Sequence, residues 1–201
     1  MSNLSVMEDW LTSADKTELL AIARDAITHY LDGANFVDLP ASPNLERPGA
    51  AFVTIWMGEH LRGCIGRVVA ELPLAQTVAL CAVDAAIADP RFSPLRRDEL
   101  PRATLEISVL SPLERITSPA DIEIGRHGLL IRLGAASGLL LPQVASEYNW
   151  SVTQFLQHTC EKAGLQRDAH LSPAAVIYRF EVILIEEPKV PGRTPHERKP
   201  H

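Results

Sequence analysis

The sequence is poor in aromatic residues and has no excess of basic charge. Aromatic side chains make up 5% of the 201 residues, so we expect a core built mainly from Leu, Val, Ile and Ala. The net charge at pH 7 is −6, which argues against a general nucleic-acid binder, because such proteins present basic surfaces. Hydrophobic residues still account for 46% of the chain, enough to form one domain or two closely fused halves.

Cysteine is also scarce, with Cys64, Cys81 and Cys160 as its three occurrences and no CxxC spacing among them. An odd number without that spacing indicates neither a disulfide framework nor a zinc site. We therefore expect no metal and no cofactor. Cys81 and Cys160 fall on apolar stripes of two predicted helices and are interpreted as core residues.

Long apolar runs, targeting segments and common catalytic motifs are missing as well. The longest uncharged apolar run, residues 72–83, is shorter than the roughly 20 residues that span a bilayer. No basic segment followed by an apolar one occurs near Met1, so no secretory signal is expected. The P-loop, GxGxxG, GxSxG and HExxH patterns do not occur. We therefore expect a cytoplasmic protein with reduced thiols and no membrane association.

Hydrophobic periodicity predicts an α+β fold. Helices are expected where apolar residues recur every three or four positions, over 14–32, 74–88 and 152–163. Strands are expected where β-branched and apolar residues cluster between turn signals, over 51–57, 61–68, 103–110, 129–133, 139–141 and 175–185. Adjacent hairpins favour a mainly antiparallel β-sheet flanked by helices.

The order of these elements repeats along the chain. Both halves, about 50–111 and 129–186, follow the order strand, strand, helix, strand. This order predicts an internal duplication within a single domain over residues 13–187. The tail over 188–201 contains four prolines and an excess of Lys and Arg. It is expected to be a disordered end, with a small docking arm as the alternative.

The segment 61–66, Leu-Arg-Gly-Cys-Ile-Gly, holds the most informative residues. Strand alternation places His60, Arg62 and Cys64 on one face and leaves the apolar residues for the core. On that face Arg62 could stabilise a thiolate at Cys64, and His60 could act as a base. Cys64 is therefore a candidate nucleophile or ligand contact. The alternative is a small residue in a tight sheet, with Arg62 in a structural ion pair.

Four further residues are candidates for the same site. Glu106, in the strand over 103–110, is expected on the face that carries Cys64 and is predicted to pair with Arg62, because a buried arginine requires a carboxylate or an anion. Asp89 and Arg91 follow the second helix, where their alternative role is to stop that helix. His127 precedes a strand, where a histidine also suits a turn.

Together these segments resemble the AMMECR domain family. The resemblance covers roughly residues 15–187 and rests, in order, on residues 61–66, 89–92, 106–110, 127–128, 140–144, 150 and 160–164. It implies an α+β fold with an antiparallel sheet. It also implies a link in prokaryotes to Memo-type and radical-SAM proteins, the AmmeMemoRadiSam grouping, and it implies no established activity.

The leading hypothesis is a small-ligand or substrate site lined by the strand over 61–68. In this hypothesis Cys64 is a reactive thiol, Arg62 binds an anion and the other candidates are supporting polar groups. The protein would be an enzyme or an accessory subunit of one. The alternative is a non-catalytic interaction module that docks a Memo-like or radical-SAM partner, with the motif serving the fold.

Overall fold

The computed structural model describes residues 10–34 and 41–188. The chain divides into two compact units, and each has its own sheet and its own apolar core. Of the described residues, the first unit holds 10–34, 41–110 and 183–188, and the second unit holds 111–182.

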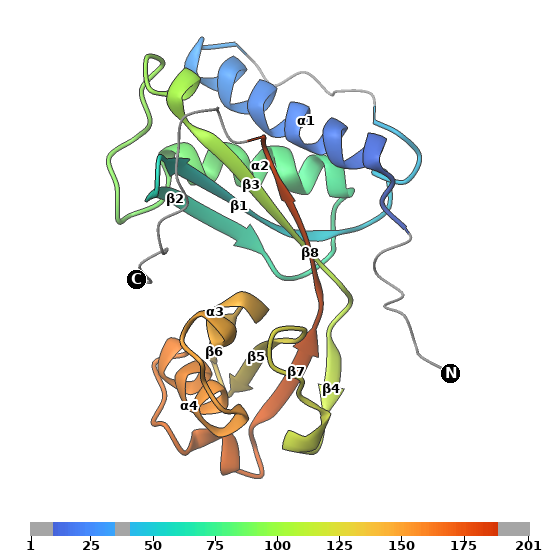
Figure 1. The fold of residues 1–201 in the computed structure, drawn as a ribbon, viewed down its shortest axis with the longest axis vertical. Helices are drawn as coiled ribbons and strands as arrows, with labels where there is room; N and C mark the ends of the chain where they lie inside the picture. The colour runs from blue at the N-terminus through green and yellow to red at the C-terminus, as the bar shows by residue number, and fades with distance from the viewer. Residues whose placement is uncertain (1–9, 35–40, 189–201) are drawn as a thin grey trace. The chain divides into compact units, whose positions relative to one another are not determined.

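In the first unit, two helices pack on each other and on one face of a four-stranded sheet (Figure 1). The helices are α1 (Ser13–Leu31) and α2 (Leu74–Ile87), and a 3₁₀ turn, η1 (Leu100–Arg102), precedes the third strand. The strands lie in the order β2 (His60–Arg67), β1 (Ala50–Met57), β3 (Thr104–Leu110) and β8 (Val182–Glu186). Strand β2 is therefore an edge of this sheet.

Alternation along the strands separates the two faces of this sheet. The residues that face the helices are fully buried and apolar, among them Ala51, Val53, Ile55, Leu105, Ile107 and Val109. They join the apolar faces of α1 and α2 in one core, whose burial is the main force that holds the unit together. The residues between them point to the opposite face, which carries most of the candidate site.

The second unit has a four-stranded sheet and two helices of its own (Figure 1). Its strands lie in the order β4 (Glu114–Ile116), β7 (Val176–Phe180), β5 (Gly128–Leu133) and β6 (Ala136–Leu140). The helices are α3 (Pro142–Glu147) and α4 (Val152–Lys162), with 3₁₀ turns η2 (Pro119–Asp121) and η3 (Ala169–Leu171). Leu129 and Phe155 lie at the centre of its core.

The predicted α+β class with antiparallel strands is confirmed, whereas the predicted strand over 175–185 is two strands in different sheets. The break between the two strands lies at Glu181, which forms two hydrogen bonds with Ser111. The Ser111 N–H donates to the Glu181 carbonyl, and the Glu181 N–H donates to Ser111 Oγ, each at 2.9 Å. Strand β4 and helix α3 were not expected.

The order strand, strand, helix, strand occurs in both units. In the second unit the short helix α3 comes before the longer helix α4. The duplication itself stays a prediction. The tail predicted to be disordered lies, except for Pro188, outside the described residues.

Gly63 allows strand β2 to lie directly against helix α2. A Cβ atom built on Gly63 would lie 2.0 Å from the carbonyl oxygen of Ala85, which belongs to the helix backbone and cannot rotate away. The Gly63 position confirms the predicted alternation for this part of the strand: Gly63 faces the helix and Cys64 faces away from it. Before Gly63 the predicted alternation is wrong, because the register shifts at Arg62 and Leu61 pairs with Trp56.

We expect Gly63→Ala to lower the free energy of unfolding by about 3 kcal/mol, because strand and helix must move apart. Urea denaturation followed by circular dichroism measures this change. Gly33→Ala is the matched control: Gly33 has φ +70° with open space around it, so only the left-handed backbone opposes the substitution, at about 1 kcal/mol. Equal losses in the two variants would contradict the packing role.

Candidate functional site

Three polar side chains form a row across the first unit's sheet. Thr54 of β1 pairs with Cys64 of β2 on one side and with Glu106 of β3 on the other. Paired residues on neighbouring strands point to the same face, so all three lie on the face opposite the helices. The Thr54 hydroxyl donates to Cys64 Sγ at 3.3 Å. We call Cys64, Thr54 and Glu106 the polar row.

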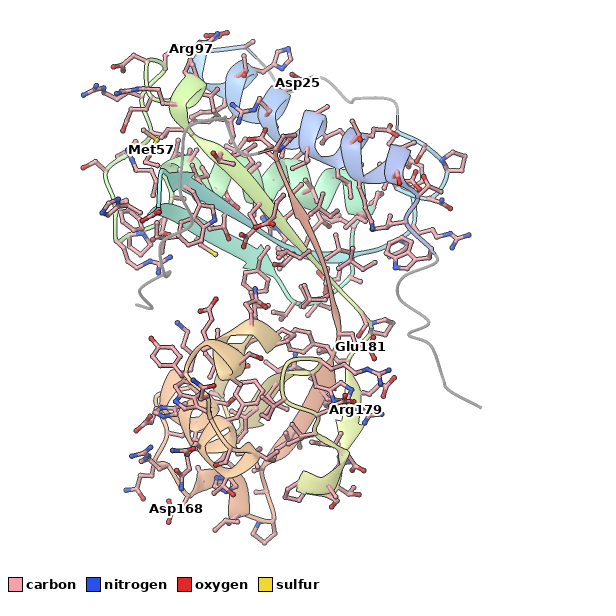
Figure 2. The ribbon with its side chains drawn as sticks, viewed as in Figure 1. Asp25, Met57, Arg97, Asp168, Arg179 and Glu181 are labelled. Atoms are coloured by element: carbon pink, nitrogen blue, oxygen red, sulfur yellow. The ribbon has the colours of Figure 1, made fainter. Side chains whose placement is uncertain are left out.

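The polar row is largely withdrawn from solvent. Thr54 is 7% exposed and Glu106 is 6% exposed, while Cys64 is half-buried. Next to the row along the strands, Phe52 lies between Gly66 and Ser108. A Cβ atom on Gly66 would lie 2.2 Å from the Phe52 ring, so the glycine lets this ring pack directly on the strand. Figure 2 shows the ribbon with its side chains and labels Met57, the last residue of β1.

The Cys64 thiol is neutral at pH 7. Burial is the main reason that its pKa lies above the ordinary value of 9.0. The hydrogen bond from Thr54 and the charge of Arg91 lower this pKa, and the charges of Asp89 and Glu106 raise it. The row therefore presents a thiol, a hydroxyl and a carboxylate, and the thiol must lose its proton before it can act as a nucleophile.

Arg62 is fully engaged by the loop that follows α2. Its Nε and Nη2 atoms donate to the Glu99 carboxylate, each at 3.2 Å, and its other contacts are the carbonyl oxygens of Ser93 and Pro94. The side chains of Arg62 and Glu99 are 15% and 18% exposed. The predicted Arg62–Glu106 pair is therefore wrong, because Glu99 is the carboxylate partner.

Asp89 and Arg91 form a clamp on the backbone of Cys64. The Cys64 N–H, on the outer edge of the sheet, donates to Asp89 Oδ2 at 2.8 Å. Arg91 binds the same carboxylate through Nε at 2.9 Å and Nη2 at 2.7 Å, and its Nη2 lies 3.5 Å from the Cys64 carbonyl oxygen. These bonds, that of Arg91 first, lower the pKa of Asp89 from 3.8 to about 2 despite its burial.

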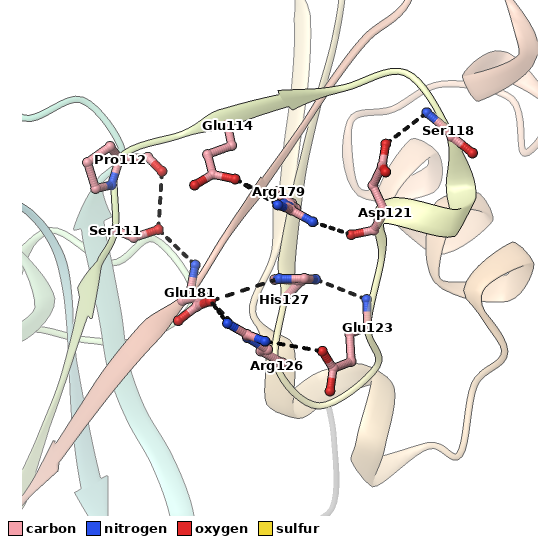
Figure 3. A network of polar contacts seen from close by, with 10 residues as sticks. All are labelled: Ser111, Pro112, Glu114, Ser118, Asp121, Glu123, Arg126, His127, Arg179 and Glu181. Carbon is pink, nitrogen blue, oxygen red and sulfur yellow. Dashed lines mark hydrogen bonds and ion pairs between the residues drawn. The ribbon is translucent and has the colours of Figure 1, made fainter. Parts of the chain in front are cut away.

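His127 belongs to the second unit and takes part in the polar network of Figure 3. Its Nδ1 accepts the Glu123 N–H at 3.0 Å, and its Nε2 lies 4.0 Å from a Glu181 carboxylate oxygen. Burial and the charges of Arg179 and Arg126 lower the pKa of His127 below 6.5. A neutral ring with Nδ1 as acceptor carries its proton on Nε2, so this histidine holds the loop before β5.

The structure thus brings only two of the six candidates into the polar row, namely Cys64 and Glu106. Asp89 and Arg91 hold the strand, Arg62 holds a loop, and His127 makes its contacts within the second unit. Sequence reasoning missed Thr54 and Glu99. Thr54 was detectable as a polar residue within an otherwise apolar strand, whereas nothing in the sequence marks Glu99 as the partner of an arginine 37 positions away.

Other features of the described residues bear on the expected function. Cys81 and Cys160 are both fully buried, which confirms their interpretation as core residues. Residues 10–34 and 41–188 contain no group of three or more His, Cys, Asp or Glu side chains placed to hold a metal ion. Within the same residues, no helix combines the length and the apolar character needed to cross a membrane.

Comparisons with known proteins place the chain among uncharacterised relatives. The model of the AMMECR1 family matches residues 20–185. A protein of Aeropyrum pernix is 42% identical to this chain, and the alignment covers 90% of this chain and 83% of that protein. A protein of Methanopyrus kandleri is 40% identical, and the alignment covers 92% of this chain and 95% of that protein. The crystal structure of an uncharacterised Pyrococcus horikoshii protein superposes with a TM-score of 0.84 at 35% identity, covering 96% of this chain and all of that one.

We expect Asp89→Asn to lower the free energy of unfolding by about 2 kcal/mol at pH 7. The folded pKa of Asp89 is about 2 and its ordinary value is 3.8, so its ionised form stabilises the fold above about pH 4. This contribution is lost as the pH falls toward 2, and the difference between variant and wild type should shrink in the same range. Urea denaturation at pH 7, 5 and 3 measures it.

Asp98→Asn is the control for this substitution. Asp98 pairs with Arg96, but both side chains are well exposed, at 63% and 70%, so the loss of its charge should leave stability unchanged. A stability difference for Asp89→Asn that stays constant from pH 7 to pH 3 would show that its carboxylate charge is not what holds the strand.

Proposed function

This chain belongs to the AMMECR1 family, and we propose that it binds a small molecule at the polar row and reacts with it through Cys64. The observation that carries the proposal is the row itself, which places a thiol, a hydroxyl and a carboxylate side by side on one sheet. Buried polar groups beside a side chain whose pKa is shifted are typical of sites where ligands are bound.

The contrast between the two faces of the sheet supports this proposal. The face toward the helices is apolar, as packing requires. On the opposite face Thr54, Glu106 and Ser108 are each less than 8% exposed, although burying polar groups opposes folding. Phe52 borders the row and offers an apolar surface beside it. A small ligand with both polar and apolar parts fits such a surface.

The reaction that fits the row is attack by Cys64 on an electrophilic carbon of the ligand. The Sγ–H proton goes to water, and the thiolate forms a bond to that carbon. The displaced group leaves with the electron pair of the broken bond and takes a proton from water. Because the resting thiol is neutral, it reacts only after it has lost its proton.

We expect the alkylation rate of Cys64 by iodoacetamide to be low at pH 7 and still rising above pH 9. Glu106→Gln removes a charge that raises the thiol pKa, so it should increase the rate a few-fold at pH 8. Thr54→Val removes a hydrogen bond that lowers this pKa and should decrease the rate. Mass spectrometry of digested protein separates Cys64 from the other two cysteines.

Glu114→Gln is the matched control, because Glu114 is an exposed carboxylate of the second unit whose partner is Arg179. Its variant should keep the wild-type rate. The proposal fails if Cys64 is not alkylated at any pH, or if its rate is the same in Thr54→Val and Glu106→Gln as in the wild type.

A second candidate function is a non-catalytic interaction module. The observation in its favour is that Arg62, Asp89 and Arg91 hold β2 to neighbouring segments, so much of the motif serves the fold. In either case we propose that the protein works in the cytoplasm with Memo-type and radical-SAM proteins. Membership of the family supports these partners, and three free cysteines fit a reducing compartment.

We expect the tagged full chain to capture a Memo-type or a radical-SAM protein from its native lysate, with identification by mass spectrometry. Cys64→Ser should capture the same partner, because it keeps the fold. Absence of both classes from the wild-type sample would overturn the partner proposal. The interaction module would be favoured if the wild type and Cys64→Ser capture the same partner and the alkylation rate of Cys64 is the same in Glu106→Gln as in the wild type.

A further inference from the structure

We propose that Arg91 is an anion-binding subsite beside Cys64, so that the ligand of the polar row carries a carboxylate or phosphate group. This inference rests on the proposed function and adds the chemical class of its ligand. It depends on how the Arg91 guanidinium is held, on which of its donors remain available, and on which charge of the Asp89–Arg91 pair faces the solvent.

The guanidinium of Arg91 is held rigidly from one side. Its Nε and Nη2 atoms bind the two oxygens of Asp89, and Nη2 also lies 3.5 Å from the Cys64 carbonyl oxygen. Among the residues that the structure describes, none accepts a hydrogen bond from its Nη1. The Phe92 ring lies 5.4 Å from the guanidinium carbon. Nη1 is therefore the Arg91 donor left for an oxyanion, and the guanidinium that carries it is fixed by Asp89.

The positive member of the clamp faces outward. The Arg91 side chain is 48% exposed, whereas the Asp89 side chain is 2% exposed. Asp89 already accepts four hydrogen bonds, from the Cys64 N–H and from the backbone N–H, Nε and Nη2 of Arg91. Asp89 thus orients the guanidinium and has little capacity left for a ligand. At the Cys64 thiol, the effect of the Arg91 charge on the pKa exceeds that of Asp89.

Arg62 was the anion binder expected from the sequence, and the structure gives that role a better candidate. The Nε, Nη1 and Nη2 atoms of Arg62 all have partners in Glu99 and the 93–94 carbonyls, and its side chain is 15% exposed. An anion at Arg62 would have to displace Glu99. An anion at Arg91 Nη1 displaces nothing in the described structure, and the Arg91 guanidinium lies 3.5 Å from the Cys64 carbonyl oxygen.

The test compares two reagents of similar size at Cys64, anionic iodoacetate and neutral iodoacetamide. Both react with the same thiolate, so the ratio of their rates does not depend on the thiol pKa. We expect this ratio to be about fivefold higher at Cys64 than at N-acetylcysteine amide, the factor that one charge pair at about 4 Å gives in water. Raising NaCl from 0.02 to 0.5 M should lower it, because salt screens the attraction.

Two substitutions locate the effect. Arg91→Gln should lower the iodoacetate-to-iodoacetamide rate ratio at Cys64 to that of N-acetylcysteine amide. Arg91→Lys keeps the positive charge and should keep most of the increase in this ratio. Arg96→Gln is the control, because Arg96 is a 70% exposed arginine paired with Asp98, and its variant should have the wild-type ratio. The salt dependence of the wild type tests the inference even if Arg91→Gln does not fold.

The outcomes separate this inference from the function on which it rests. If Cys64 reacts but its ratio equals that of the model thiol, or does not change in Arg91→Gln, the anion subsite is wrong and the polar row still stands. If Cys64 reacts with neither reagent, the proposed function fails and the subsite fails with it.

Discussion

The carboxylate of Asp89 is the contact on which the geometry around Cys64 depends. Strand β2 is the edge of its sheet, and an edge strand leaves every second N–H without a partner in the sheet. Asp89 accepts the Cys64 N–H at this edge and binds Arg91 at the same time. One buried carboxylate thus binds the backbone of the edge strand and the Arg91 side chain at once, and it holds the residue that carries the thiol.

Close packing adds a second constraint on the same strand. Gly63 admits the Ala85 carbonyl on one face, and Gly66 admits the Phe52 ring on the other. Strand β2 is therefore pressed between a helix backbone and an aromatic ring, and its twist and register have little freedom. The two glycines of the motif let β2 approach both groups, since a side chain at Gly63 would meet the helix backbone and one at Gly66 would meet the Phe52 ring.

Local patterns in the sequence predicted the elements well and the site only partly. Period-two alternation correctly separated Cys64 from Gly63, because the direction of a side chain depends only on the local strand. The row of Cys64, Thr54 and Glu106 depends on the register of three strands, and the Arg62–Glu99 pair depends on a loop. Such contacts join distant positions, and a single sequence carries no local signal for them. For the same reason the break between β7 and β8 at Glu181, where Glu181 binds Ser111, was not expected.

The neutral thiol and the exposed guanidinium are consistent with each other. Arg91 lowers the pKa of Cys64, so by linkage a thiolate at Cys64 would attract Arg91 and compete with any anion bound there. Burial raises the pKa of the thiol, and a neutral thiol does not compete with a ligand for the Arg91 guanidinium, which Asp89 already binds from one side. A site that holds an anion beside a nucleophilic thiol needs this order of events, in which the ligand binds first and the proton leaves Cys64 afterwards. A thiol pKa raised by burial is therefore compatible with an anion bound beside Cys64, and the thiol reacts once it has lost its proton.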